Sequence, residues 1–173
     1  MFGKHTDNRG FSLVEIIIVV AIMAVFTGTI SYGLSMSNGK HADEAARKLA
    51  SELQHIRTVS MGKYKVYVTV RRDDDKIYIE QQAYNTKKDF DDDPAHNKAQ
   101  YKIETIIPAN RVNIKYNTKS STDNELNSVG ITFCFSRVDG KPTDGYPTDF
   151  KITKAHTERH VIISELTGNV TVE

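Results

Sequence analysis

The sequence contains few of the residues and motifs from which catalytic sites are usually built. It has no tryptophan, and its single cysteine, Cys134, excludes an internal disulfide bond. Its 23 lysine and arginine side chains nearly balance 22 aspartate and glutamate side chains, so no strong basic field favours nucleic acid as the main partner. The sequence lacks a glycine-rich phosphate loop, a nucleophile elbow and the context of a catalytic triad. We therefore expect neither enzymatic activity nor a cofactor.

Apolar residues are concentrated near the N-terminus. Residues 16–26 are wholly apolar, and residues 11–34 contain one charged side chain, Glu15. A helix rises about 1.5 Å per residue, so residues 16–34 are just long enough to cross a bilayer. Lys4 and Arg9 precede this segment, and the positive-inside rule places that end in the cytoplasm. The pattern predicts a single-pass protein of the cytoplasmic membrane, with its C-terminal domain outside.

A carboxylate at the head of this segment needs an explanation. A charged side chain within a membrane span costs about 2.5–3.5 kcal/mol on insertion scales, so Glu15 indicates a specific use. It argues against a conventional secretory signal, whose short apolar core residues 16–26 would otherwise fit. A plain anchor that is never processed is the other alternative.

Residues 9–15 read RGFSLVE and closely resemble the class III signal of type IV pilins and type II secretion pseudopilins. In that family a prepilin peptidase cuts after the glycine and methylates the new N-terminal residue. The resemblance implies a cut between Gly10 and Phe11 and N-methylation of Phe11. Glu15 matches the family's acidic residue, which acts in assembly.

The chemistry of these positions agrees with that reading. Gly10 has no side chain to hinder a peptidase at the backbone. Cleavage would create an α-amine at Phe11, and with a pKa of about 7.7–8 such an amine is mainly protonated at neutral pH. Glu15 lies one turn further along a helix. It can pair with the amine of its own chain or of an adjacent subunit; the family implies the second, and the sequence leaves both open.

The resemblance also implies partners and a location. The partners are prepilin peptidase, other pilin or pseudopilin subunits, the inner-membrane assembly platform and the cytoplasmic membrane, and the final location is a pilus or pseudopilus. The sequence does not distinguish type II secretion from a type IV or competence pilus. The alternative function is a membrane-anchored binding module for DNA uptake or adhesion. DNA binding has little support, since residues 71–72 and 87–88 are only small basic spots.

An amphipathic helix is predicted over residues 35–61. Apolar residues recur there at steps of three and four, at Ala42, Ala45, Ala46, Leu49, Leu53 and Ile56. This run is similar to that of H-type minor pseudopilins. Asn38 and Gly39 interrupt the apolar pattern, so this helix is either separate from the first or its continuation. Gly28, Gly33 and Gly39 are expected weak points.

The remainder of the chain predicts an antiparallel β domain. Alternating apolar residues and turn signals predict a hairpin of two strands, 64–70 and 76–82, and further strands at 101–107, 111–116, 129–138, 150–153, 161–166 and 170–172. Residues 85–99 and 117–128 are expected to be polar loops. One sheet, or two, would pack on the 42–61 helix, which gives a pilin-like α+β fold. The predicted parts are a leader (1–10), a transmembrane and assembly helix (11–34), an amphipathic helix (35–61) and the β domain (62–173).

Three further features are predicted to be structural. The aspartates at 73–75 and 89–93 lack the D-x-D-x-D-G spacing of calcium loops, so they are expected to be solvated, with a weak calcium site as the alternative. His156 and His160 are four residues apart, but in a strand-and-turn pattern rather than on a helix, and no metal is expected there. Cys134 lies in an alternating apolar run and is expected to be a buried thiol.

Overall fold

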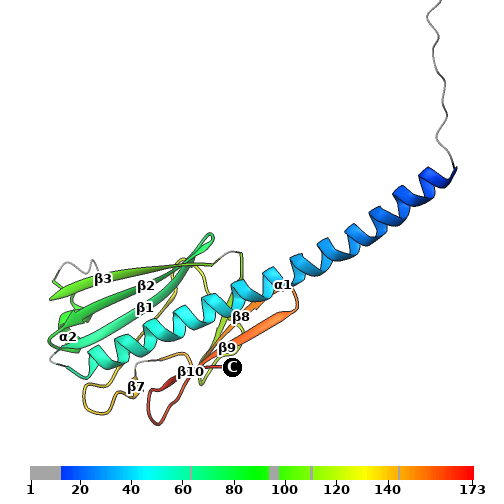
Figure 1. Ribbon diagram of the computed structural model, residues 1–173. Coiled ribbons are helices and arrows are strands. Elements are labelled where there is room, and N and C mark those ends of the chain that lie inside the picture. Colours follow the sequence, from blue (N-terminus) through cyan, green and yellow to red (C-terminus); the bar gives the residue numbers. More distant parts are fainter. Residues whose placement is uncertain (1–12, 63, 94–97, 110, 144) are drawn as a thin grey trace, which may run out of the picture. The chain divides into compact units, whose positions relative to one another are not determined.

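The computed structural model describes residues 13–62, 64–93, 98–109, 111–143 and 145–173, with the backbone alone for residues 28–38. The chain divides into two units, residues 1–37 and 38–173. Helix α1 (Leu13–Ser60) crosses the boundary between them, so the two predicted helices form one element (Figure 1). Neither Gly28, Gly33 nor Gly39 ends the helix, because a glycine costs only about 1 kcal/mol relative to alanine in a helix interior.

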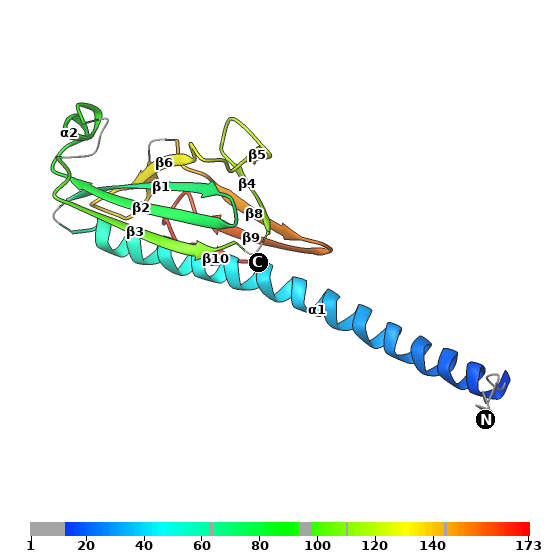
Figure 2. The ribbon, with the colours of Figure 1, turned by 90° about the horizontal axis from the view of Figure 1, so that it is seen from above.

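The second unit contains two antiparallel five-stranded sheets, which confirms the predicted α+β class. The first has the order β3-β2-β1-β6-β7, with β1 (Lys65–Asp73), β2 (Lys76–Tyr84), β3 (Tyr101–Pro108), β6 (Ile131–Phe135) and β7 (Pro142–Thr143). The second has the order β10-β9-β8-β4-β5, with β4 (Asn113–Asn117), β5 (Asn124–Glu125), β8 (Asp149–Lys154), β9 (Thr157–Ile163) and β10 (Val170–Val172). Figure 2 shows β1, β2 and β3 running beside the second half of α1.

The predicted hairpin is confirmed. Strands β1 and β2 pair from Lys65 with Tyr84 to Asp73 with Lys76, which leaves a two-residue turn of Asp74 and Asp75. The strands are thus longer than predicted, since residues 71–73 belong to β1 rather than to the turn. Asp74 adopts a left-handed backbone with φ of 49°, a conformation that aspartate accepts more readily than most residues.

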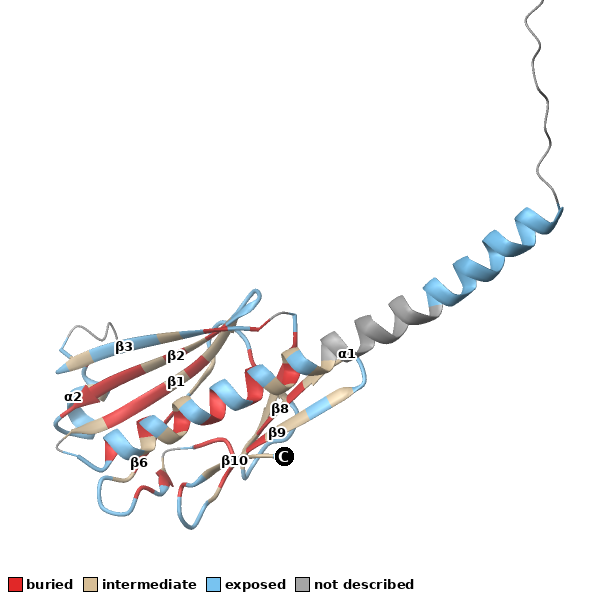
Figure 3. Cartoon of the chain, viewed as in Figure 1, coloured by how far each residue is buried: buried red, intermediate tan, exposed pale blue. Residues whose placement is uncertain are grey.

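The apolar stripe of α1 forms the centre of the core. The stripe residues predicted from the sequence are buried, and they belong to one cluster with residues of both sheets (Figure 3). Phe133 and Phe135 of the first sheet and Phe150 of the second are among its largest buried side chains. Cys134 is buried as well, as predicted. The alanines of the stripe have little side chain, so the helix backbone can approach the sheets closely.

Polar contacts also tie α1 to each sheet. Glu52 Oε1 accepts hydrogen bonds from Gln81 Nε2 and Thr105 Oγ1 of the first sheet, both at 2.9 Å. From the second sheet, the Val170 amide donates to Gln54 Oε1 at 3.1 Å, and Arg159 Nε lies 3.1 Å from Asp43 Oδ1. The helix therefore fixes the position of both sheets.

Two turns of matching sequence and structure meet at the end of α1. The turn after β6 reads SRVDGK (136–141), and the turn after β9 reads SELTGN (164–169). In each, the serine amide donates to the carbonyl five residues later, at 2.7 and 2.9 Å, and the glycine amide donates back to the serine carbonyl, at 3.0 and 2.7 Å. The two sheets thus end in equivalent hairpins, and in Figure 1 both turns lie below α1.

The glycines of the two turns, Gly140 and Gly168, touch each other. Both have positive φ, 68° and 69°. A Cβ on Gly168 would lie 1.8 Å from the Gly140 carbonyl oxygen, so no larger residue fits without a backbone shift. Arg57 of α1 donates from Nε and Nη2 to the Thr167 carbonyl at 3.0 and 2.7 Å. This contact joins the helix to the place where the two sheets meet.

We expect Gly168→Ala to lower the free energy of unfolding well beyond the cost of its backbone conformation. Left-handed backbone at a residue other than glycine costs about 1–3 kcal/mol, and the clash with Gly140 adds to it. Gly145→Ala is the matched control, because Gly145 has φ of 74° but open space around a Cβ. Urea denaturation of both variants measures the difference. Equal losses would show that the contact between the turns contributes nothing.

Candidate functional site

The three predicted site residues lie at the start of the chain. Gly10 and Phe11 are outside the described residues, whereas Glu15 is described and lies in the first turn of α1. A carboxylate there interacts favourably with the positive end of the helix dipole. Its side chain borders a shallow hollow of about 270 Å³ that is otherwise lined by Ile16, Val19 and Val20. The carboxylate is therefore exposed next to an apolar surface.

The apolar surface around Glu15 continues along the helix. The large apolar side chains of this turn and the next three are between 45% and 74% exposed, namely Leu13, Val14, Ile16, Ile17, Ile18, Val19, Val20, Ile22, Met23, Val25 and Phe26. Thr27 Oγ1 donates to the Met23 carbonyl at 2.7 Å, so its hydroxyl is satisfied within the helix. A helix that is apolar on all sides is normally covered by other helices or by lipid.

Within the part of the chain that the structure describes, no helical segment combines the length and the hydrophobicity that a bilayer crossing requires.

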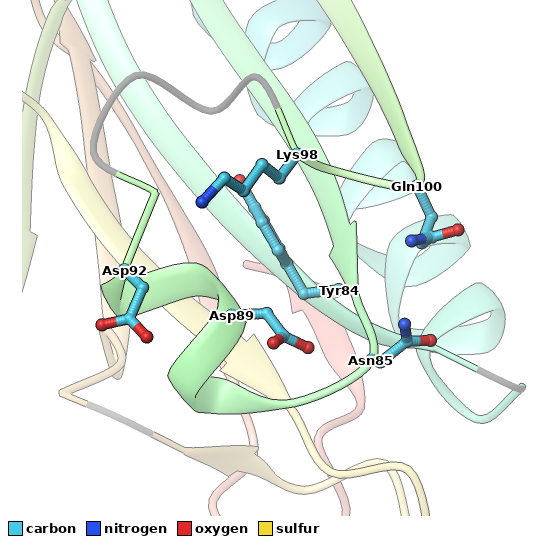
Figure 4. A pocket seen from close by; sticks show the side chains of 6 residues that line it. All are labelled: Tyr84, Asn85, Asp89, Asp92, Lys98 and Gln100. Carbon is cyan, nitrogen blue, oxygen red and sulfur yellow. The ribbon is translucent and has the colours of Figure 1, made fainter.

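A second hollow lies on the outer side of the first sheet. It measures about 270 Å³ and is lined by polar side chains from the end of β2, from helix α2 (Lys87–Asp91) and from the segment before β3 (Figure 4), namely Tyr84, Asn85, Asp89, Asp92, Lys98 and Gln100. The prediction of a loop over 85–99 was wrong at α2. Thr86 Oγ1 accepts from the Asp89 amide at 3.2 Å and Asp89 Oδ2 accepts from the Thr86 amide at 3.0 Å, which forms a capping box.

Aspartates of this segment hold its structure. Asp93 is only 4% exposed, although the whole acidic run was predicted to be solvated. Its Oδ2 accepts from the Lys98 amide at 2.6 Å and from the Tyr84 hydroxyl at 3.3 Å. Burial and the nearby Asp93 carboxylate raise the pKa of Tyr84 to about 12, so its hydroxyl remains a donor. Within the described ranges, no three His, Cys, Asp or Glu side chains are grouped so that they could hold a metal ion.

The predicted basic spot at residues 71–72 is engaged within the first sheet. Arg71 Nε lies 2.8 Å from Glu80 Oε1, its Nη2 lies 3.3 Å from Glu104 Oε2, and its guanidinium stands 4.1 Å from the centre of the Tyr78 ring. Arg72 Nε donates to the Asp74 carbonyl at 3.2 Å. These contacts satisfy Arg71 with protein carboxylates, which weakens the case for a phosphate-binding surface here.

The two predicted histidines occupy different elements. His156 lies in the turn between β8 and β9, and His160 lies within β9. Asp149 Oδ2 is 2.8 Å from His160 Nδ1, and Glu158 Oε1 is 2.9 Å from His160 Nε2. Hydrogen bonds to Asp149 first, and then to Glu158, raise the pKa of His160. Both ring nitrogens are therefore occupied by carboxylates.

Stability is expected to depend on pH through His160. Because its pKa is raised on folding, the protonated form contributes stability that is full below the unfolded pKa of about 6.5 and is lost as the pH rises through the folded pKa. His160→Gln should therefore lower the free energy of unfolding at pH 5.5, by about 1 kcal/mol or less because the site is partly exposed, and should match the wild type at pH 9. A constant difference across this range, measured by urea denaturation, would contradict this account.

The comparisons with known proteins concern the N-terminal segment. Residues 6–31 match the family described as the prokaryotic N-terminal methylation motif, a range that includes Gly10, Phe11 and Glu15. No curated protein and no solved structure matches the chain. The match confirms the prepilin-type methylation motif that the sequence predicted. The cut after Gly10, the methylation of Phe11, the role of Glu15 in assembly and the similarity to H-type subunits stay predictions.

Proposed function

We propose that this chain, which carries the N-terminal methylation motif of type IV pilins and pseudopilins, is a minor structural subunit of a pilin-type filament. The observation that carries the proposal is the motif itself, which sets Glu15 five residues after the glycine of a prepilin signal. The filament is either the pseudopilus of type II secretion or a type IV or competence pilus. The chain is a substrate of prepilin peptidase and not itself a catalyst.

The chemistry of the N-terminus follows from the proposed cut after Gly10. Cleavage removes Lys4 and Arg9 and leaves a cationic α-amine at Phe11, which methylation keeps basic. The first part of α1 then has one cation at its head and one carboxylate at Glu15. The exposed apolar side chains that follow are the part of the helix that lipid would cover before assembly and other helices would cover afterwards.

Glu15 determines the register of that packing. In a surrounding of low dielectric, an unpaired carboxylate or ammonium is costly, and close pairing of the two removes much of this cost. When the amine of one subunit pairs with Glu15 of the next, the helices are held at one axial position. The apolar hollow beside Glu15 provides space for an apolar side chain of the neighbouring helix.

The assignment to the minor, H-type subunits rests on two weaker features. One is the stripe from Ala42 to Ile56, which is buried against both sheets. The other is the lack of a disulfide, which many major pilins contain. The alternative of a DNA-binding module is less well supported, because Arg71 is already paired with carboxylates of its own sheet.

Co-expression of the full chain with and without a prepilin peptidase tests the proposal. With the peptidase, the chain should become ten residues shorter and remain in the membrane fraction. Without it, the full-length chain should accumulate there. Equal lengths in both cultures would contradict the proposal, and so would a peptidase-independent cut beyond residue 30, which would indicate an ordinary secretory signal.

A further inference from the structure

Strand β3 is a long, exposed edge of the first sheet. In the part of the chain that the structure describes, the edge strands are β3 and β7 of the first sheet and β10 and β5 of the second. Strands β5, β7 and β10 have only two or three residues, and β7 contains Pro142. Strand β3 has eight residues, and Figure 3 shows it largely exposed. Proteins usually protect an edge by shortening it or by placing proline in it, because its backbone groups can pair with another strand.

The register with β2 shows which backbone groups of β3 are available. The Ala109 amide donates to the Asp75 carbonyl at 2.6 Å. Hydrogen-bonded pairs recur at every second residue of an antiparallel ladder, so residues 101, 103, 105 and 107 direct their N–H and C=O groups to β2. The groups of Lys102, Glu104 and Ile106 then point away from β2. Among the described residues, no backbone group outside the sheet bonds to them.

The charges beside this edge indicate what an added strand should carry. Glu104 lies opposite Glu80 in the register, and like charges directly opposite each other are unfavourable. Arg71 is shared between the two carboxylates, at 2.8 Å from Glu80 and 3.3 Å from Glu104. Lys102 also lies 3.5 Å from Glu80. Glu80 thus contacts two cations, whereas Glu104 shares one of them and its side chain is 39% exposed. A cation on the next strand would compensate Glu104.

We propose that the edge of β3 binds an extended segment of another protein, which adds a strand antiparallel to β3. A basic residue of this segment lies opposite Glu104. An apolar residue two positions before it lies opposite Ile106, which is 48% exposed, and an acidic residue two positions after it lies opposite Lys102. In such strand addition, backbone hydrogen bonds provide affinity and alternate side chains provide specificity.

The other side of the edge has room for the side chains that alternate with these. A hollow of about 260 Å³ lies between α1 and the end of β3, lined by Lys48, Ser51 and Glu52 of α1 and by residues 105–108. Thr105 Oγ1 donates to Glu52 Oε1 at 2.9 Å, which joins the two sides of the hollow. Successive side chains of a strand point to opposite faces, so the residue between the apolar and the basic position points to this side.

A second copy of the chain is a poorer occupant. Two β3 strands paired antiparallel around Ile103 would also set Lys102 opposite Glu104, but they would place Gln100 opposite Ile106. Their α1 helices, which run beside β3 in Figure 2, would then be antiparallel as well. Copies anchored in one membrane have parallel helices, so this choice of occupant rests on the proposed function.

The test measures binding of labelled peptides to the full chain, purified in detergent from cells with prepilin peptidase. The peptide STVTKVETS carries the proposed pattern, and STVTEVKTS has the same composition with the two charges exchanged. Fluorescence anisotropy should show that the first peptide binds roughly three- to tenfold more tightly. Equal affinities, or no binding of either peptide, would overturn the proposal.

Two substitutions of one residue test the backbone contact. Ile106→Pro removes an N–H that points away from β2, and edge strands accept proline at such positions, so the fold should persist while binding of STVTKVETS falls at least about tenfold. Ile106→Ala keeps the N–H and should lower binding only about twofold. In the unsubstituted chain, the same peptide should slow hydrogen exchange of residues 101–108.

Equal binding by the two variants, slowed exchange elsewhere in the chain, or a dimer of the chain that forms through β3 would overturn the proposal. The mass of the same preparation shows whether the leader was removed. Absence of peptide binding by a correctly shortened chain leaves the proposed function intact, whereas an intact leader refutes that function whatever the peptides do.

Discussion

Gly10→Ala is expected to abolish removal of the leader, with the full-length chain as the main product. The added methyl group lies at the residue before the cut, where a peptidase must approach the backbone closely. The Phe11 amine would then not form, and Lys4 and Arg9 would remain attached to the apolar helix. Immunoblotting of cells that also express prepilin peptidase measures the ratio of full-length to shortened chain.

A second glycine in the leader provides the control. Gly3→Ala makes the same chemical change seven residues before Gly10, so the leader should be removed as in the wild type. Equal processing of the two variants would contradict the assignment of the cut to Gly10.

Glu15→Val is expected to leave processing and membrane association intact but to reduce incorporation into the filament by about a hundredfold or more. The variant leaves the Phe11 amine without its carboxylate, and breaking one partner of a buried ion pair costs about 3–5 kcal/mol. Valine keeps the apolar surface that α1 exposes around this position. The ratio of sheared filament to membrane fraction measures incorporation.

Two variants separate the charge of Glu15 from its shape. Glu15→Gln has nearly the same size and should fail like Glu15→Val, whereas Glu15→Asp keeps the charge and should retain part of the incorporation. Normal incorporation of Glu15→Val would refute the pairing argument, even if processing at Gly10 were correct.

The methylation motif could be recognised in the sequence because a peptidase reads a short linear segment. Gly10, Phe11 and Glu15 owe their predicted roles to spacing within residues 9–15, and no tertiary contact is needed to recognise them. The partner of Glu15 could not be predicted in the same way. The amine of its own chain and the amine of another subunit belong to the same residue of the sequence. Which of the two pairs with Glu15 therefore depends on how a second chain packs against this one.

The fold was predictable where one periodicity dominates. The stripe over residues 42–56 has the period of a helix and is buried as predicted, and the hairpin of β1 and β2 has the alternation of strands. Strand β9 was predicted to start at 161 but starts at Thr157, because its first half is polar on both faces. Arg159 lies in this polar half of β9 and pairs with Asp43 of α1, which is far away in the sequence but adjacent in the fold.

Three other features were not predicted from the sequence. Helix α2 is only five residues long, so its capping box at Thr86 and Asp89 was a better signal than any periodicity. Asp93 is buried because Tyr84 and the Lys98 amide surround its carboxylate. The close contact of Gly140 with Gly168 likewise requires two sheets to meet, although the repeated S-x-x-x-G pattern of both turns is present in the sequence.

The central claim is that this chain matures by a cut after Gly10 and methylation of the residue that follows. Tandem mass spectrometry of the chain purified from membranes of cells with prepilin peptidase tests it most directly. The account predicts a mature chain that begins with N-methylated Phe11. A chain that still begins at Met1, or one that begins after residue 30, would contradict it.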